Sequence, residues 1–405
     1  MAPESVRAEV GEIAPLDGLR GVAVLWVILF HVSALRTKLG DPWVDLLASS
    51  RHVEPIVGAG YLGVDLFFLI SGFLLALPWF VHAAQGKRAP SAREFYARRL
   101  RRIMPAYYVQ LVVLFALVLP LLYGVRYWRS DLYVYLYNAL AHALFLHNTT
   151  PLTSGSMAVN GALWTLAVEA QFYLLIPLVL PLFVRWPYAA SVTAFALATF
   201  WHIGVHDGLD GLVAAEMALG APWGWPESIV RYLLLHQLPS YLVHFALGIV
   251  LGRAWLVWRS REQPWIERVI VGALSACAFG LLYRMIAVDG RLLGELSWIV
   301  PPLCLGALLF WAVTTRWSLV QTILARGPLA FLGRVSYSAY LYHLPVLLLW
   351  NAYARSLPAW TSLPLYLATV LAIATLSWRF VEQPFLRKKK KMVSGTIFQT
   401  AENGP

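Results

Sequence analysis

Long apolar runs recur from one end of this 405-residue sequence to the other. A run of about 18 residues or more can cross the roughly 30 Å hydrocarbon core of a bilayer as a helix. A soluble fold could not bury so many of these runs, because only 13% of the residues are charged and the mean hydropathy is +0.64. The sequence therefore predicts an all-α integral membrane protein.

The basic residues fall in particular loops. Lysines and arginines cluster within 87–102, 253–268, 316–334 and 379–391, whereas the connection at 207–228 carries acids and no lysine or arginine. Since basic loops stay on the cytoplasmic side, this pattern predicts about ten crossings of the cell membrane with both termini in the cytoplasm. The expected spans lie near 18–37, 60–83, 105–124, 162–184, 188–206, 229–252, 267–288, 295–314, 329–352 and 363–382.

The segment 131–148 is also apolar, but an eleventh crossing there would place the basic loop at 253–268 outside. We expect a re-entrant or interfacial helix instead. Residues 1–391 are expected to form one membrane domain and 392–405 a disordered cytoplasmic tail. The net charge of +11 is explained by the basic loops, so no nucleic-acid partner is expected, and the two cysteines lie in separate apolar runs that suggest no metal site.

Ionisable side chains interrupt several of the expected spans. Inserting one at bilayer depth costs roughly 2.5 to 3.5 kcal/mol, so each indicates either a function or an internal partner. His31 follows Arg20 by eleven positions, or about 16 Å of helix, which places Arg20 at the cytoplasmic mouth and His31 beyond the midplane. Asp65 lies near the outer end of the next span, and a carboxylate beside an imidazole fixes the tautomer of a general base. We expect Asp65 to pair with His31.

Two later spans add polar groups at a similar depth. Glu169 and Gln171 follow Trp164 and precede Tyr173, and His343 follows Ser336 and Tyr337. A buried histidine or carboxylate can also be purely structural, as a hydrogen-bonded packing group or an ion pair. For His343 the residues leave a site role and a structural role equally open.

Arginines form a dense cluster before the third span. Arg98, Arg99 and Arg102 belong to it, and a three-residue spacing on a helix puts two guanidinium groups on one face. Such a pair suits the phosphates of a nucleotide-like cofactor through bidentate contacts. Retention of positive charge in the cytoplasm and contact with anionic lipid headgroups explain the charge equally well.

These polar residues stand in a fixed order along the chain. The segments are Arg20 to His31, GVDLFF at 63–68, RLRRI at 99–103, WTLAVEAQFY at 164–173 and SYSAYLYH at 336–343. Together they resemble the signatures of the acyltransferase 3 family of membrane O-acyltransferases, over residues 14–386. Ala170 departs from the family pattern, because many members carry a second glutamate there.

The resemblance implies a function. An acyl group, by default acetyl, would pass from cytoplasmic acyl-coenzyme A to a hydroxyl of a polysaccharide, a glycolipid or a glycosylated natural product, with no permanently bound cofactor and no metal. Carried over by position, His31 would be the catalytic base, supported by Asp65 and Glu169. Arg20, Arg98, Arg99 and Arg102 would hold the donor.

The resemblance also suggests which residues line the substrates. These are Trp164, Gln171, Tyr173, Ser336, Tyr337 and His343. Some members carry a fused extracytoplasmic hydrolase-like module that this sequence lacks, so we expect no second active site in this chain.

A transporter or flippase for a glycolipid or a polar small molecule is the alternative, because transporters also carry polar residues at bilayer depth. That class is typically built from related halves, and no internal repeat is visible here. A purely structural scaffold would leave the polar residues at depth unexplained. Direct transfer and an acyl-enzyme intermediate both remain open, since the residues nominate no nucleophile.

Overall fold

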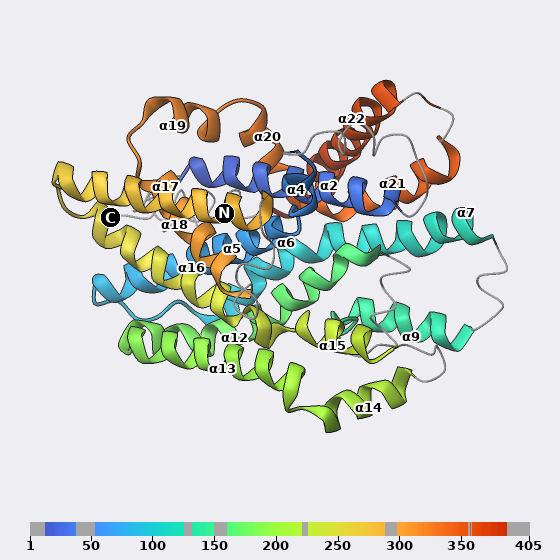
Figure 1. The fold of residues 1–405 in the computed structure, drawn as a ribbon, viewed down its shortest axis with the longest axis horizontal. Coiled ribbons are helices and arrows are strands. Elements are labelled where there is room, and N and C mark those ends of the chain that lie inside the picture. The colour runs from blue at the N-terminus through green and yellow to red at the C-terminus, as the bar shows by residue number, and fades with distance from the viewer. Residues whose placement is uncertain are drawn as a thin grey trace, which may run out of the picture.

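Helices make up almost all of the computed structural model of this protein (Figure 1). It describes residues 13–37, 53–124, 132–149, 160–220, 226–287, 298–354, 357 and 359–386. Within these ranges no strand occurs, which confirms the expected all-α class. The expected tail at 392–405 and the domain boundary before it lie outside the described residues.

In the described part of the chain, eight helices are long and apolar enough to cross a membrane. They are α2 (Pro15–Thr37), α5 (Leu62–Ala84), α6 (Ala92–Val113) with η1 (Leu114–Val118) and α7 (Leu119–Tyr123), η2 (Gly161–Leu163) with α12 (Trp164–Arg185), α13 (Pro187–Asp207), α15 (Glu227–Leu235) with α16 (Leu238–Arg259), α17 (Trp265–Ala287), and α22 (Ala359–Ser377) with η5 (Trp378–Glu382). A ninth crossing results if α18 (Val300–Thr314) is joined to α19 (Ser318–Ala325), although the two helices meet at a 103° bend.

The span expected at 329–352 is divided between α20 (Pro328–Arg334) and α21 (Ser336–Tyr353). By its composition α21 is not one of the eight spanning helices, because serines, tyrosines and a histidine lower its hydropathy. Ser336, Ser338, Tyr340 and His343 are nevertheless all buried. Other helices therefore surround α21, and its polar side chains face protein instead of lipid.

The central helix is α5, and Figure 1 shows it in the middle of the bundle beside α16. Of its apolar window 83% is buried inside the protein, against 17% for the peripheral α13 and α17. Glycines allow the close approach of α5 to α16. A Cβ atom at Gly72 would overlap the carbonyl oxygen of Phe245, and one at Gly248 would overlap that of Leu69. The two backbones therefore touch directly.

Residues 131–148, expected to form a helix that does not cross, contain α9 (Leu132–Ala143). Its twelve residues extend about 18 Å, too little for the hydrocarbon core. The hydroxyl of Tyr107 on α6 donates to the carbonyl oxygen of His142 at 2.8 Å, which anchors the end of α9. The buried rings of His142 and His147 stack there with centroids 4.3 Å apart.

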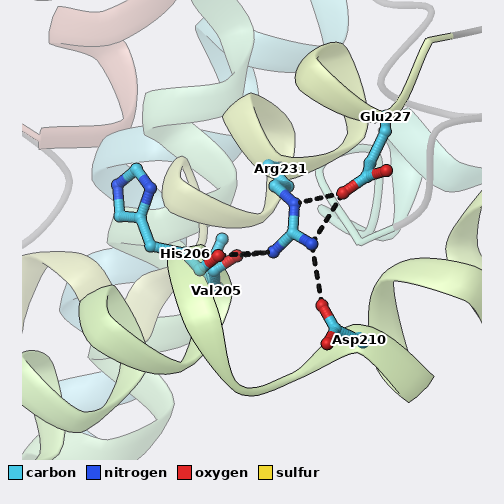
Figure 2. A network of polar contacts seen from close by, with 5 residues as sticks. All are labelled: Val205, His206, Asp210, Glu227 and Arg231. Carbon is cyan, nitrogen blue, oxygen red and sulfur yellow. Dashed lines mark hydrogen bonds and ion pairs between the residues drawn. The ribbon is translucent and has the colours of Figure 1, made fainter.

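Two short helices, α4 (Val53–Gly58) and α14 (Asp210–Gly220), were not expected from the sequence. An arginine fixes α14 to its neighbours, as Figure 2 shows. One guanidinium nitrogen of Arg231 on α15 lies 2.8 Å from Asp210 and 2.6 Å from Glu227. Another donates to the backbone oxygens of Val205 and His206 at the end of α13. A single side chain thus connects three consecutive helices.

Candidate active site

A cavity lies among α2, α5, α6, α12 and α21, with about 790 Å³ of empty space when its open mouth is included. Residues from five distant parts of the sequence meet there, including seven of the residues singled out from the sequence. These seven are Arg20, Arg99, Arg102, Glu169, Tyr173, Ser336 and Tyr337.

Three arginines make the cavity strongly basic. Arg20 comes from α2, and Arg99 and Arg102 come from one face of α6, as their three-residue spacing predicts. The guanidinium of Arg99 lies 5.9 Å from the ring of Phe95 and 5.7 Å from that of Tyr173. Its Nε atom is buried without a hydrogen-bond partner among the described residues. Two aromatic rings thus hold this cation in place while one of its donors stays unused.

Glu169 is the carboxylate of the cavity. Its Oε1 atom accepts a hydrogen bond from Ser71 Oγ at 2.8 Å and another from the hydroxyl of Tyr173. The carboxylate also interacts electrostatically with Arg20 and Arg99. These contacts place the Glu169 carboxylate between the arginines and two hydroxyl donors, so Glu169 is suited to holding the arginines together.

Hydroxyl groups of α21 connect the cavity to its walls. The hydroxyl of Tyr337 donates to the carbonyl oxygen of Ile103 on α6 at 3.0 Å. Tyr340, one turn further along, lies 2.8 Å from Thr165 Oγ1 and donates to the carbonyl oxygen of Ala162 at 3.0 Å. These bonds fix α21 against both α6 and the start of α12.

His31 and His343 lie next to each other beyond Tyr340. Nδ1 of His31 is 3.2 Å from Nε2 of His343, and it is 2.9 Å from the carbonyl oxygen of Val27. Nδ1 of His343 is 2.7 Å from the carbonyl oxygen of Tyr340. A carbonyl oxygen only accepts, so we assign the proton of each neutral ring to Nδ1. His31 then presents Nε2, which neither contact uses, as its basic atom.

The two histidines are not among the residues that line the cavity. Tyr340 connects the two sites: its ring lines the cavity and stands 5.5 Å from the ring of His343, centroid to centroid. Phe67, another lining residue, lies 6.0 Å from Tyr340. The basic cavity and the histidine pair thus both lie next to Tyr340.

The predicted pairing of Asp65 with His31 is wrong. Asp65 Oδ1 lies 3.3 Å from Nε2 of His244 on α16. The rotation of α5 explains the error. Gly63 faces Ala23 on α2, and two residues further along a helix a side chain has turned by roughly 200°. Asp65 therefore points away from α2 and towards α16.

Three further residues from the sequence analysis lie away from the cavity lining. Arg98 pairs with Glu94, also on α6, at 3.3 Å and does not line the cavity. Gln171 donates to Asn148 Oδ1 at 2.9 Å. Trp164 stacks edge-on against His236, with ring centroids 4.6 Å apart.

Ser71 and His244 are two polar residues of the site region that were not predicted from the sequence. Val64, Phe67, Phe68, Ser71 and Leu75 all line the cavity from α5. Their three- and four-residue spacing puts them on one helix face, so periodicity could have found Ser71. His244 interrupts an expected span at 229–252, which is the same signal that pointed to His31. Within the described residues, no three histidine, cysteine or acidic side chains come together as a metal site would require.

Comparisons with known proteins extend these observations. A family model described as an acyltransferase domain matches residues 13–379. The chain is similar to the peptidoglycan O-acetyltransferase OatA of Listeria monocytogenes, with 26% identity over 394 residues that cover 92% of this chain and 55% of that protein. It is also similar to the O-acetyltransferase OatA of Staphylococcus aureus, with 25% identity over 410 residues that cover 94% of this chain and 60% of that protein. The chain thus spans little more than half the length of these curated relatives, and no solved structure matches it.

Proposed function

This chain belongs to the acyltransferase family whose model matches residues 13–379, and from that premise we propose that it is a membrane O-acetyltransferase acting on a sugar polymer. The acetyl group would come from acetyl-coenzyme A in the cytoplasm. The observation that carries the proposal is the contact through Tyr340 between a cavity with three arginines and the pair His31 and His343. Donor and base would meet at that tyrosine.

The arginines are the proposed site for the phosphates of coenzyme A. Guanidinium groups bind phosphate oxygens in bidentate fashion, and Arg20, Arg99 and Arg102 outnumber the single acid Glu169 in the cavity lining. The buried, unused Nε atom of Arg99 supports an anionic ligand, because a buried donor without a partner costs free energy.

The position of His31 along α2 suits an extended donor. Eleven residues separate Arg20 from His31, which corresponds to about 16 Å along the helix. The pantetheine arm of coenzyme A would span this distance past Tyr340 and bring the thioester to the histidine pair. The phosphates would stay near the arginines.

The reaction needs one base and no metal. Nε2 of His31 would take the proton of the acceptor hydroxyl while the oxygen attacks the thioester carbonyl carbon. The carbon–sulfur bond then breaks, and the departing thiolate takes the proton from the imidazolium, so an ester and free coenzyme A are formed. His343 would hold His31 in the required tautomer, the role predicted for Asp65. Asp65 and Glu169 would stabilise the surrounding helices and the arginines.

The relatives support a proposal for the chemical class of the acceptor, but not for its identity. Two similar proteins are named as O-acetyltransferases, one of them of peptidoglycan, so we propose a hydroxyl on a cell-wall glycan. The distribution of basic loops supports a cell-membrane protein with both termini in the cytoplasm. The donor site would then lie on the cytoplasmic side, and the histidines would lie nearer the outer side.

The test is acetyl transfer by purified protein in lipid vesicles. Radiolabelled acetyl-coenzyme A is supplied on one side and isolated peptidoglycan glycan strands on the other, for the wild type and His31→Ala. Label should appear in the glycan with the wild type alone. Transfer by His31→Ala at the wild-type rate, or flux of glycan without any acetyl donor, would overturn the proposal.

A further inference from the structure

A second hollow, separate from the basic cavity, runs between α13, α16 and α18. It is an open groove with about 1580 Å³ of empty space, and most of its lining residues are apolar. Arg253 and Arg261 also line it. An adjoining hollow shares Phe80, Arg253 and Val257 with the groove and adds Arg259. The apolar groove thus leads to a group of arginines.

The arginine group lies on the same side of the bundle as the basic segment of α6. The adjoining hollow reaches Gln85, the residue that caps the end of α5. The chain continues from Gln85 directly into the segment 87–102, which carries Arg99 and Arg102. By the distribution of basic loops this side faces the cytoplasm.

The part of the groove that leads up to Arg253 matches one leaflet of a bilayer. Along α16 the lining extends from Val243 to Trp258, and its stretch from Val243 to Arg253 covers ten residues or about 15 Å. This is half of the roughly 30 Å hydrocarbon thickness. A phospholipid whose acyl chain lies in the groove and ends at the membrane midplane would therefore have its headgroup at Arg253.

Two of these arginines have no carboxylate partner in the part of the chain that the structure describes. The guanidinium of Arg253 lies 6.0 Å from the ring of Phe80, and that of Arg259 lies 5.3 Å from the ring of Trp255. Stacking on a ring face leaves the N–H donors in the guanidinium plane available. Arg261, by contrast, pairs with Glu267 at 2.9 Å.

We propose that this groove binds an anionic phospholipid of the inner leaflet, with the acyl chains between α13, α16 and α18 and the phosphate at Arg253 and Arg259. Unpaired cations at the end of an apolar groove favour a headgroup with net negative charge over a zwitterionic one. The inference goes beyond the proposed acetyl transfer and does not depend on it, because the site is distinct from the basic cavity.

The test measures lipid retention by native mass spectrometry of detergent-purified protein. Phosphatidylglycerol and phosphatidylcholine with identical acyl chains are the two probes, and neither experiment contains an acyl donor. Phosphatidylglycerol should bind preferentially to the wild type. The double variant Arg253→Gln/Arg259→Gln should bind it about tenfold more weakly.

Three further variants separate the lipid site from folding defects. Arg253→Lys/Arg259→Lys keeps both charges and should retain the preference, whereas Ala254→Trp fills the groove and should lose both lipids. Arg379→Gln removes an exposed arginine that also stacks on a ring, 5.7 Å from Phe380, but does not line the groove, so it should bind like the wild type. Equal retention of both lipids by the wild type, or unchanged phosphatidylglycerol binding by folded Arg253→Gln/Arg259→Gln or by Ala254→Trp, would overturn the proposal.

Discussion

Nδ1 of His31 lies 3.2 Å from Nε2 of His343, although the two residues are 312 positions apart in the sequence. Each ring also has its Nδ1 atom next to a backbone carbonyl oxygen. One imidazole therefore orients the other, an arrangement in which a second histidine takes the place often held by a carboxylate.

Replacing His31 or His343 should affect catalysis to different degrees. His31→Ala removes the proposed base, and kcat should fall by about 100- to 10,000-fold. His343→Ala removes one hydrogen bond to that base, so kcat should fall by about three- to tenfold, with a changed pH profile. Rates of acetyl transfer measured between pH 5 and 9 check both. The exposed His206→Gln variant is the control, and loss of activity there would point to a general folding defect.

Arginines on the two sides of α6 should behave differently. Arg99→Gln and Arg102→Gln each remove a charged donor from the cavity, and KM for acetyl-coenzyme A should rise by about ten- to a hundredfold. Arg101→Gln is the matched control, since Arg101 is exposed on the same helix and does not line the cavity. An equal rise in KM for Arg101→Gln would show that the total charge of the helix matters, and not the cavity.

Glu169→Gln should separate an electrostatic role from a catalytic one. The substitution keeps the shape and an acceptor for Ser71 and Tyr173 but removes the negative charge among the arginines. We expect a lower melting temperature that saturating acetyl-coenzyme A restores, because the phosphates then supply the missing charge. Retained kcat would agree with this role, and a loss of kcat as large as that of His31→Ala would contradict it.

Asp65 and His244 should be energetically coupled. Since their side chains are 3.3 Å apart, the double variant Asp65→Asn/His244→Gln should lose less melting temperature than the two single variants combined. Asp65→Asn with His31→Gln should be additive, because Asp65 on α5 faces His244 on α16 whereas His31 on α2 contacts His343. Coupling between Asp65 and His31 would reinstate the pairing expected from the sequence.

Acid should destabilise the protein through His142 and His147. Burial lowers the pKa of His147 from 6.5 to about 4, and burial together with the neighbouring His147 lowers that of His142 to about 3. Below pH 6.5 the unfolded chain takes up protons that the folded rings do not, so stability is lost as the pH falls from 6.5 towards 4, by about 1.4 kcal/mol per pH unit for each ring.

The measurement is the melting temperature in detergent between pH 7 and pH 4. His142→Phe/His147→Phe keeps two stacked rings without titratable groups and should flatten the decline. The exposed His206→Gln variant should keep the wild-type decline. An unchanged slope in the phenylalanine variant would contradict the assignment.

Features that depend on local spacing were predictable from the sequence. The three-residue separation of Arg99 and Arg102 placed them on one helix face, and both line the cavity. Segment 131–148 was expected not to cross, and α9 proves too short to do so. Hydrophobicity and helical periodicity are properties of one segment, so a single sequence carries them.

Pairings between helices were less predictable. The sequence predicts a similar depth for Asp65 and His31, but depth alone does not give the rotation of each helix about its axis, and Asp65 faces His244 instead. The partner of His31 comes from α21, whose polar composition reflects its burial among other helices. Such rotations are decided by the packing of the whole bundle.

The direct contact of α5 with α16 has a genetic consequence. Every single-nucleotide change that replaces a glycine adds a side chain, and at Gly72 or Gly248 that side chain would meet a carbonyl oxygen of the opposing helix. These two codons should therefore tolerate substitution as poorly in a saturation library as the codon of His31, although neither glycine can take part in chemistry. A map of mutational intolerance would therefore show the contact between α5 and α16 as clearly as the proposed catalytic residues.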